Sequence, residues 1–174
     1  MGNRILLHVC CGPCSTSSIE RLISDGWEPV LFYSDSNIFP REEYEKRYDN
    51  LVIVANHYGL QLIKDSWDHE MWREHIRGHE KDAEHQERCK FCFYFNLKRA
   101  SNKAKELGIE HFCTTLTVSR FKNSETIFAE GEKFEGFEKI DFKKKNGFQR
   151  SIELSKELEL YRQRYCGCEF SFHD

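Results

Sequence analysis

No apolar run in this sequence approaches the roughly 18 residues that a membrane-spanning helix needs. The apolar stretch from Ile5 to Val9 is interrupted by His8 and is too short for the hydrophobic region of a secretory signal. Both absences speak against a membrane or secreted protein, and we expect a cytoplasmic location. Disulfide bonds are rare in that reducing compartment, so cysteines there need another explanation.

Motifs for nucleotide binding are also missing. The sequence contains no Gly-x-Gly-x-x-Gly and no phosphate-loop lysine motif, so it gives no sign of a tightly bound dinucleotide. It has no internal repeat, no linker and no low-complexity segment. A chain of 174 residues fits one domain and can bury a core without disulfides. We therefore predict a single domain over residues 1–174.

The formal net charge is -3, so the molecule as a whole does not attract polyanions. The local picture differs, because six basic residues and no acidic residue lie between Arg88 and Lys105. Solvated surfaces are the ordinary explanation of such runs, but their position beside cysteine motifs favours an anionic substrate. Further basic groups are Lys143, Lys144, Lys145 with Arg150, and Arg120 with Lys122.

Eight cysteines are many for a protein of a reducing compartment, and they indicate metal or redox chemistry. The first group, Cys10, Cys11 and Cys14, falls between a predicted strand and a predicted helix. Backbone N–H groups and the dipole at a helix N-terminus lower the pKa of a thiol, and the thiolate is the form that binds metal. Gly12 and Pro13 bend the chain, so these thiols can face one point.

Two further pairs bring the clustered thiols to seven. Cys89 and Cys92 form a C-x-x-C at a predicted helix start, a spacing that serves zinc, iron–sulfur clusters and thiol redox chemistry alike. Cys166 and Cys168 flank Gly167, which allows both side chains to reach one metal. One [4Fe–4S] cluster or one tetrahedral zinc takes about four ligands. Either some thiols serve the substrate, or a second metal ion is bound.

Short apolar runs alternate with amphipathic segments, which predicts an α/β fold with a mostly parallel sheet. Ligands of such sheets bind beyond the carboxyl ends of the strands, where the turn with Cys10 lies. The expected strands are Ile5–Val9, Pro29–Tyr33, Leu60–Ile63, His111–Leu116 and Lys139–Phe142. The expected helices are Thr16–Ser24, Pro40–Gly59, Ser66–Gly78, Phe91–Leu107, Ser124–Lys133 and Ser151–Gln163.

Two aspartates belong to the same predicted sheet edge. Asp35 and Asp141 lie at the ends of the second and last predicted strands. Either carboxylate is a candidate catalytic group, as a non-thiol metal ligand or as a proton donor, with Asp141 ahead of Asp35. The eighth cysteine, Cys113, stands alone inside a predicted strand, and we interpret it as an inert core residue.

Five segments of this sequence resemble one known family in the same order along the chain. They are His8–Ser15, Glu87–Phe93, Thr114–Leu116, Asp141–Lys144 and Tyr161–Cys168, with Tyr-Cys-Gly-Cys as the most specific. The family is that of the QueH-type, cobalamin-independent epoxyqueuosine reductases. The sequence departs from its pattern twice. Asp35-Ser36 stands where the family usually has Asn-Pro, and Arg120-Phe121 stands where a proline followed by an aromatic residue is common.

The resemblance implies a fold, a reaction and cofactors. The implied fold is a Rossmann-like three-layer sandwich similar to the adenine-nucleotide alpha-hydrolase group. The implied reaction reduces the epoxide of epoxyqueuosine at wobble position 34 of a tRNA with a GUN anticodon, giving queuosine. The implied cofactors are a [4Fe–4S] cluster and a neighbouring iron or zinc ion. We assign all seven clustered thiols to this metal centre, with Cys10, Cys11, Cys89 and Cys92 as cofactor-binding candidates.

A tRNA substrate calls for phosphate contacts and for aromatic rings that stack on unpaired bases. Two other functions stay open. One is an iron–sulfur-dependent tRNA sulfur-transfer enzyme, which would need an ATP loop where this sequence has cysteines. The other is a non-enzymatic zinc module that binds RNA. The candidate substrate contacts are Arg88, Arg99, Arg120, Lys143, Lys144, Tyr161 and Arg162, with Tyr33, Phe39 and Tyr165 as further stacking candidates.

Overall fold

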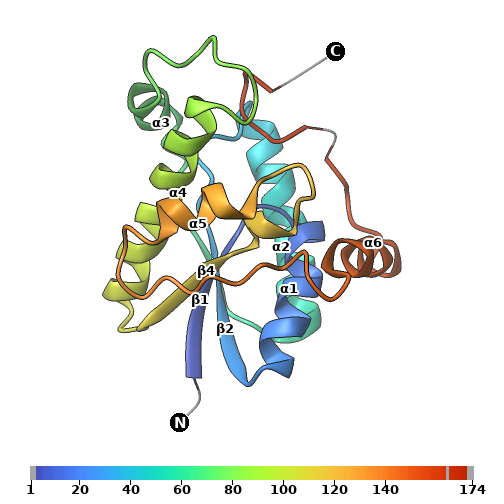
Figure 1. Cartoon of the computed structure of the whole chain (residues 1–174). Helices are drawn as coiled ribbons and strands as arrows, with labels where there is room; N and C mark the ends of the chain where they lie inside the picture. The colour runs from blue at the N-terminus through green and yellow to red at the C-terminus, as the bar shows by residue number, and fades with distance from the viewer. Residues whose placement is uncertain (1–2, 164, 172–174) are drawn as a thin grey trace.

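The computed structural model describes residues 3–163 and 165–171 (Figure 1). Its centre is a parallel sheet of four strands in the order β3-β2-β1-β4. The strands are β1 (Asn3–Val9), β2 (Trp27–Tyr33), β3 (Leu62–Lys64) and β4 (His111–Thr114). The predicted α/β class with a parallel sheet is confirmed.

Helices cover both faces of the sheet, because successive side chains of a buried strand point to opposite sides. Leu7 of β1 packs with the residues of α1 and α2, whereas Leu6 packs with those of α4 and α5. Figure 1 shows α1 and α6 on one side of the sheet and α4 and α5 on the other. The helices are α1 (Gly12–Ser24), α2 (Arg41–Tyr58), α3 (His69–His75), α4 (Glu87–Glu106), α5 (Ser124–Gly131) and α6 (Gly147–Glu157), with a 3-10 turn η1 (Thr115–Val118).

The register of the strands brings three chain segments to one edge. Val9 at the end of β1 pairs with Tyr33 at the end of β2, and His8 pairs with Thr114 at the end of β4. The residues that follow these strands therefore meet at the carboxyl edge of the sheet, where α/β proteins bind their ligands. Cys10 is one of them.

The predicted fifth strand, Lys139–Phe142, is wrong. The parallel pairing to β4 is a single bridge between Phe112 and Phe137, two residues earlier. After that point a side chain takes the place of a neighbouring strand as hydrogen-bond partner of the backbone. Thr117 Oγ1 donates to the Ile140 carbonyl and accepts from the Phe142 N–H. These hydrogen bonds replace a strand ladder and turn the chain toward α6.

Several helix boundaries also differ from the prediction. α1 begins at Gly12, not Thr16, and α4 begins at Glu87, not Phe91, so both cysteine motifs reach into helical first turns. α3 is shorter than the predicted helix over Ser66–Gly78. Among the described residues, no helix is long and apolar enough to cross a membrane.

The last helix is displaced toward the N-terminus, covering Gly147–Glu157 in place of Ser151–Gln163. It ends early because Glu159 adopts a left-handed conformation (φ 55°) and Leu160 turns into the core. The Tyr161 N–H then donates to Asn50 Oδ1 of α2 (2.9 Å). This exit leaves residues 160–163 and 165–171 outside the helix.

Shortening a buried side chain at the centre of the sheet tests this packing. Leu7 is fully buried, so Leu7→Ala should lower the free energy of unfolding by about 2–5 kcal/mol. Ile53, 45 % exposed on α2, is the control, and Ile53→Ala should change it by less than about 0.5 kcal/mol. Urea unfolding followed by circular dichroism measures both. Equal effects of the two substitutions would contradict the assigned core.

Candidate metal centre

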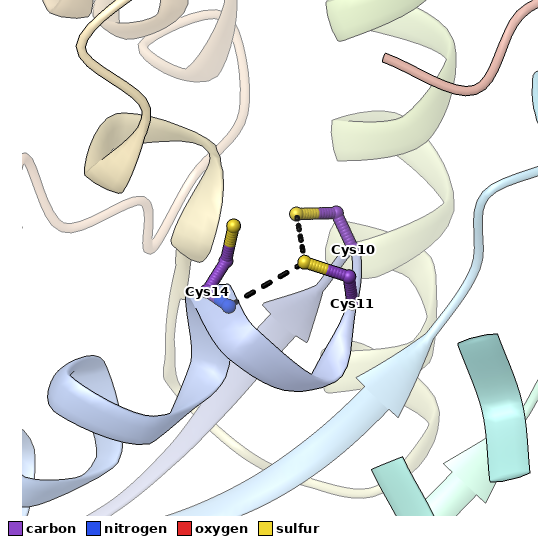
Figure 2. Close-up of side chains that lie close together, drawn as sticks. All are labelled: Cys10, Cys11 and Cys14. Atoms are coloured by element: carbon purple, nitrogen blue, oxygen red, sulfur yellow. Dashed lines mark hydrogen bonds between the residues drawn. The ribbon is translucent and has the colours of Figure 1, made fainter. Parts of the chain in front are cut away.

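The sulfur atoms of Cys10, Cys11 and Cys14 form a compact group at the N-terminus of α1. They all lie within 4.8 Å of one another, and in the described part of the chain they are the one such set of three or more potential ligands (Figure 2). Cys11 is the N-cap residue, and its sulfur accepts the N–H of Cys14 at 3.4 Å. Pro13 suits the first turn because it has no N–H to leave unpaired.

Cys11 has the most anionic thiol of the three. Hydrogen bonds from the Cys10 and Cys14 side chains, and then the charge of Arg47, hold the pKa of Cys11 well below its usual range. Gln163 also donates its Nε2 to the Cys11 sulfur at 3.1 Å. A buried thiolate supported in this way is ready to bind a metal cation.

The other four clustered cysteines lie across a cavity of about 340 Å³ from this group. Cys89 and Cys92 lie in the first turns of α4, and Cys166 and Cys168 lie in the C-terminal tail (residues 165–171). All four line the cavity together with Cys10 and Cys14, while Cys11, 1 % exposed, lies behind its wall. Three motifs separated by most of the chain thus converge on one cavity.

Without a bound cation, ionisation of the thiols contributed by α4 and the C-terminal tail is unfavourable. Burial, followed by repulsion from Cys166 and Cys168, raises the pKa of Cys92 well above its usual range. Burial and Cys166 also raise the pKa of Cys168. A bound metal removes this penalty, because it deprotonates coordinating thiols and compensates their charge. The set of thiol donors therefore fits a thiophilic metal or an iron–sulfur cluster.

Arg47 of α2 ties the tail to the fold. Its guanidinium is 2 % exposed and donates to the backbone carbonyls of Tyr165 (3.0 Å) and Cys166 (2.9 Å). Glu43 balances its charge at 3.0 Å. Gly167 has φ 132°, and a Cβ there would lie 3.0 Å from Arg47 Nη1. The positive φ favours glycine between the two cysteines, and a Cβ there would also crowd the side chains of Ile38 and Arg47.

A buried histidine positions Asp35 on the cavity wall. His8 lies 2.8 Å from Thr114 Oγ1 through Nδ1 and 3.1 Å from Asp35 Oδ1 through Nε2. Burial lowers the pKa of His8, but the charge of Asp35 outweighs this and raises it. Burial in turn raises the pKa of Asp35 against the opposing effect of His8. Asp35 Oδ2 is buried and has no hydrogen-bond partner among the described residues.

The structure brings only some of the predicted site residues to the cavity. Asp141 does not line it, since its carboxylate accepts the Lys143 N–H at 3.0 Å and its carbonyl accepts from Arg21. Cys113 is buried in the core, as predicted. Of the other candidates, Asp35, Arg88, Arg162 and Tyr165 line the cavity, whereas Tyr33, Phe39, Arg99, Arg120, Lys143, Lys144 and Tyr161 do not.

Two of the predicted substrate contacts have structural roles instead. Arg88 is 2 % exposed and donates to backbone carbonyls of the loop before α4, including those of His79 and Asp82. Arg99 pairs with Asp65 and Asp68, both at 2.7 Å. The Arg99 guanidinium is thus neutralised by two carboxylates, whereas Arg88 is buried and donates to backbone carbonyls.

Sequence reasoning missed three residues that act on the thiols or on Asp35. Arg47 follows Tyr44 and precedes Leu51 on the apolar stripe of α2, and an arginine in such a stripe is a usable signal of a buried ion pair. His8 interrupts a buried strand just before the cysteines, which is a similar signal. Lys122 lines the cavity, and the thiolate of Cys166, ahead of Cys10 and Cys14, raises its pKa. Its sequence context marked it only as part of a small basic group with Arg120 and did not indicate a place beside the thiols.

Comparisons with known proteins agree on one family. The family model described as "Epoxyqueuosine reductase QueH" matches residues 5–174. The QueH proteins of Streptococcus pyogenes serotype M1 and Thermotoga maritima are each 35 % identical to this chain. Both alignments cover 96 % of this chain, with 69 % of the first protein and 89 % of the second.

A solved structure shares the fold. It is the U34-tRNA thiolase NcsA from Methanococcus maripaludis with its [4Fe-4S] cluster, matched with a TM-score of 0.57 at 12 % identity. The match covers 99 % of this chain and 63 % of the thiolase, so the chain spans less than two thirds of that protein. At this identity the likeness shows the fold alone, and it agrees with the predicted α/β fold with a parallel sheet.

A matched pair of cysteine variants tests the metal centre. Cys11 and Cys113 are both buried, but only Cys11 lies in the compact thiol group. After anaerobic purification, Cys11→Ala should bind much less metal than the wild type, because it removes the thiol best prepared to ionise. Cys113→Ala should bind as much as the wild type. Elemental analysis measures both, and equal metal contents would contradict the assignment of Cys11.

Proposed function

The chain belongs to the epoxyqueuosine reductase QueH family, and from that premise we propose that it reduces the epoxide of epoxyqueuosine in tRNA. The product is the alkene of queuosine at wobble position 34. The reaction consumes two electrons and two protons and releases one water molecule. The observation that carries the proposal is the convergence of three cysteine motifs on one cavity at the carboxyl edge of the sheet.

The metal centre that we propose is held by the seven clustered thiols. They exceed the roughly four ligands of one [4Fe–4S] cluster, which supports a neighbouring iron or zinc ion as the second component. The bound centre would deliver electrons singly to the epoxide and accept charge that develops on its oxygen. Gln163 supports the Cys11 thiolate by its hydrogen bond, and Asn96 donates to the Cys92 sulfur at 3.8 Å. Such contacts tune the affinity and potential of a centre.

Asp35 is the carboxylate that we propose acts in the cavity. His8 holds one of its oxygens, so the side chain cannot turn away, and Oδ2 is left for a metal ion or a proton. Asp35 occupies a position where the family commonly has asparagine. Lys122 is the second proton source on the cavity lining. The departure at position 35 thus gives this chain an acidic group where an amide is usual.

Binding of the tRNA is proposed to involve the cations that remain free of internal ion pairs. Arg120, Lys144 and Arg162 are exposed and form no ion pair with carboxylates of the described residues. Lys143 donates to Ser124 Oγ rather than to a carboxylate. By contrast, Lys90 and Lys103 of α4 pair with Glu87 and Glu106. The GUN anticodon and the cytoplasmic location stay predictions.

Anaerobic purification followed by iron, sulfide and zinc analysis tests the centre. A brown protein with a broad visible absorbance band and about four or more irons is the expected result. It should convert epoxyqueuosine-tRNA to queuosine-tRNA with a chemical reductant, as detected by mass spectrometry of the nucleosides. A colourless protein that holds only zinc after anaerobic reconstitution would contradict the reductase and leave a zinc module that binds RNA.

A pair of aspartate variants separates the two catalytic candidates. Asp35→Ala removes both side-chain oxygens, whereas asparagine would only restore the amide that is usual in the family. If Asp35 transfers a proton or binds the ion, kcat/KM for epoxyqueuosine-tRNA should fall by about 100-fold or more in Asp35→Ala. Asp141→Ala should stay near the wild-type value, because Asp141 lies outside the cavity lining. The reverse order of effects would reinstate Asp141.

A further inference from the structure

Phe121 is an exposed aromatic residue that also belongs to the cavity lining. Its side chain is 68 % exposed, the largest value among the large apolar residues that the structure describes. It also lines the cavity that the thiols share, in the loop between η1 and α5. An aromatic ring that is exposed to solvent and also lines the cavity lies at the rim of that cavity.

The ring is held in place rather than free. The Arg120 guanidinium lies 5.3 Å from the centre of the Phe121 ring and 4.7 Å from that of Phe148. Phe148 is half-buried near the start of α6 and also lines the cavity. The arginine therefore links the exposed ring to the fold through cation–π contacts. A ring oriented in advance loses little conformational entropy when a ligand stacks on it.

The surroundings of the ring are positive. Lys122 and Arg162 line the same cavity, and neither forms an ion pair with a carboxylate of the described residues. Burial lowers the pKa of Lys143, Asp141 opposes this, and the charge of Lys122 adds to it, which places the two lysines near each other. An aromatic ring framed by unpaired cations matches the way proteins bind unpaired bases and the phosphates between them.

We propose that Phe121, with Arg120 beside it, is a stacking platform for an unpaired base of the tRNA anticodon loop next to the modified nucleotide. This inference rests on the proposed function and adds the residue that positions the RNA. Stacking at the rim would hold the neighbouring base while the modified base enters the cavity toward the thiols. The exposed Arg162 would contact an adjoining phosphate, while Lys122 lies deeper, beside the thiols.

The test measures binding of an anticodon stem-loop RNA by fluorescence anisotropy at fixed salt. Phe121→Ala should weaken binding about tenfold or more. Phe121→Leu, which keeps an apolar side chain without a ring, should weaken RNA binding to a similar extent. Phe121→Trp, which keeps an aromatic ring, should bind the RNA as tightly as the wild type. Met71→Ala is the matched control, because Met71 is 58 % exposed on α3 and does not line the cavity. It should bind like the wild type.

Turnover and metal content provide independent readouts. All variants should hold wild-type amounts of metal, and Phe121→Ala should raise KM for the tRNA while kcat at saturation stays near the wild-type value. If Phe121→Ala or Phe121→Leu binds the stem-loop as the wild type does, the stacking platform is overturned. Loss of turnover with a protein electron donor but not with dithionite, at unchanged RNA binding, would instead mark a docking site for that donor.

The proposed function and the platform can fail separately. A wild-type protein that binds the stem-loop through Phe121 but leaves the epoxide intact would overturn the reductase and keep the platform. A wild-type protein that reduces the epoxide, with a Phe121→Ala variant of equal RNA affinity, would overturn only the platform. No binding of the stem-loop by the wild type would overturn the platform at once.

Discussion

The parallel register of β1 with β2 and β4 is the constraint on which the rest of the site depends. It makes the three strands end at one level, so Cys10, Asp35 and Thr115 follow them at the same edge. Thr115 Oγ1 accepts the Cys10 N–H at 3.3 Å, and His8 joins the end of β4 to Asp35. A shift of one residue in a strand would turn its alternate side chains to the opposite face. The site and the core are therefore specified by the same hydrogen bonds.

Charge distribution then explains how so many thiols can coexist. Six thiols that line a small cavity, with Cys11 next to them, repel one another once they ionise, and burial strengthens the repulsion. Cations from three separate elements reduce this repulsion by stabilising the thiolate form. They are Arg47 beside Cys11, Arg88 of α4, and Lys122 in the loop before α5. This arrangement favours thiolates without filling the cavity, which leaves room for a metal and a substrate.

The sequence predicted the elements with a strong local signal and missed those decided by tertiary contacts. The alternation of apolar strands and amphipathic helices is local, so the layers and the parallel sheet followed from it. The position where α6 ends is decided by tertiary contacts. Leu160 packs into the core, and the Tyr161 N–H donates a hydrogen bond to Asn50 Oδ1 of α2. The thiol motifs were readable from spacing. The sequence ranked Asp141 ahead of Asp35, whereas the structure places only Asp35 on the cavity lining, because His8 holds its carboxylate and the Lys143 N–H donates to that of Asp141.

The ligand candidates come from the first loop and from the last described segment of the chain. A metal that binds Cys10 and Cys166 together would close a loop that contains nearly all of the fold. Such a bond acts on the unfolded chain as a cross-link does, because it removes the entropy of two distant ends. Metal loading and the folding of the tail are then one thermodynamic event. Metal occupancy would therefore change the stability of the packing of residues 165–171 as well as the redox activity.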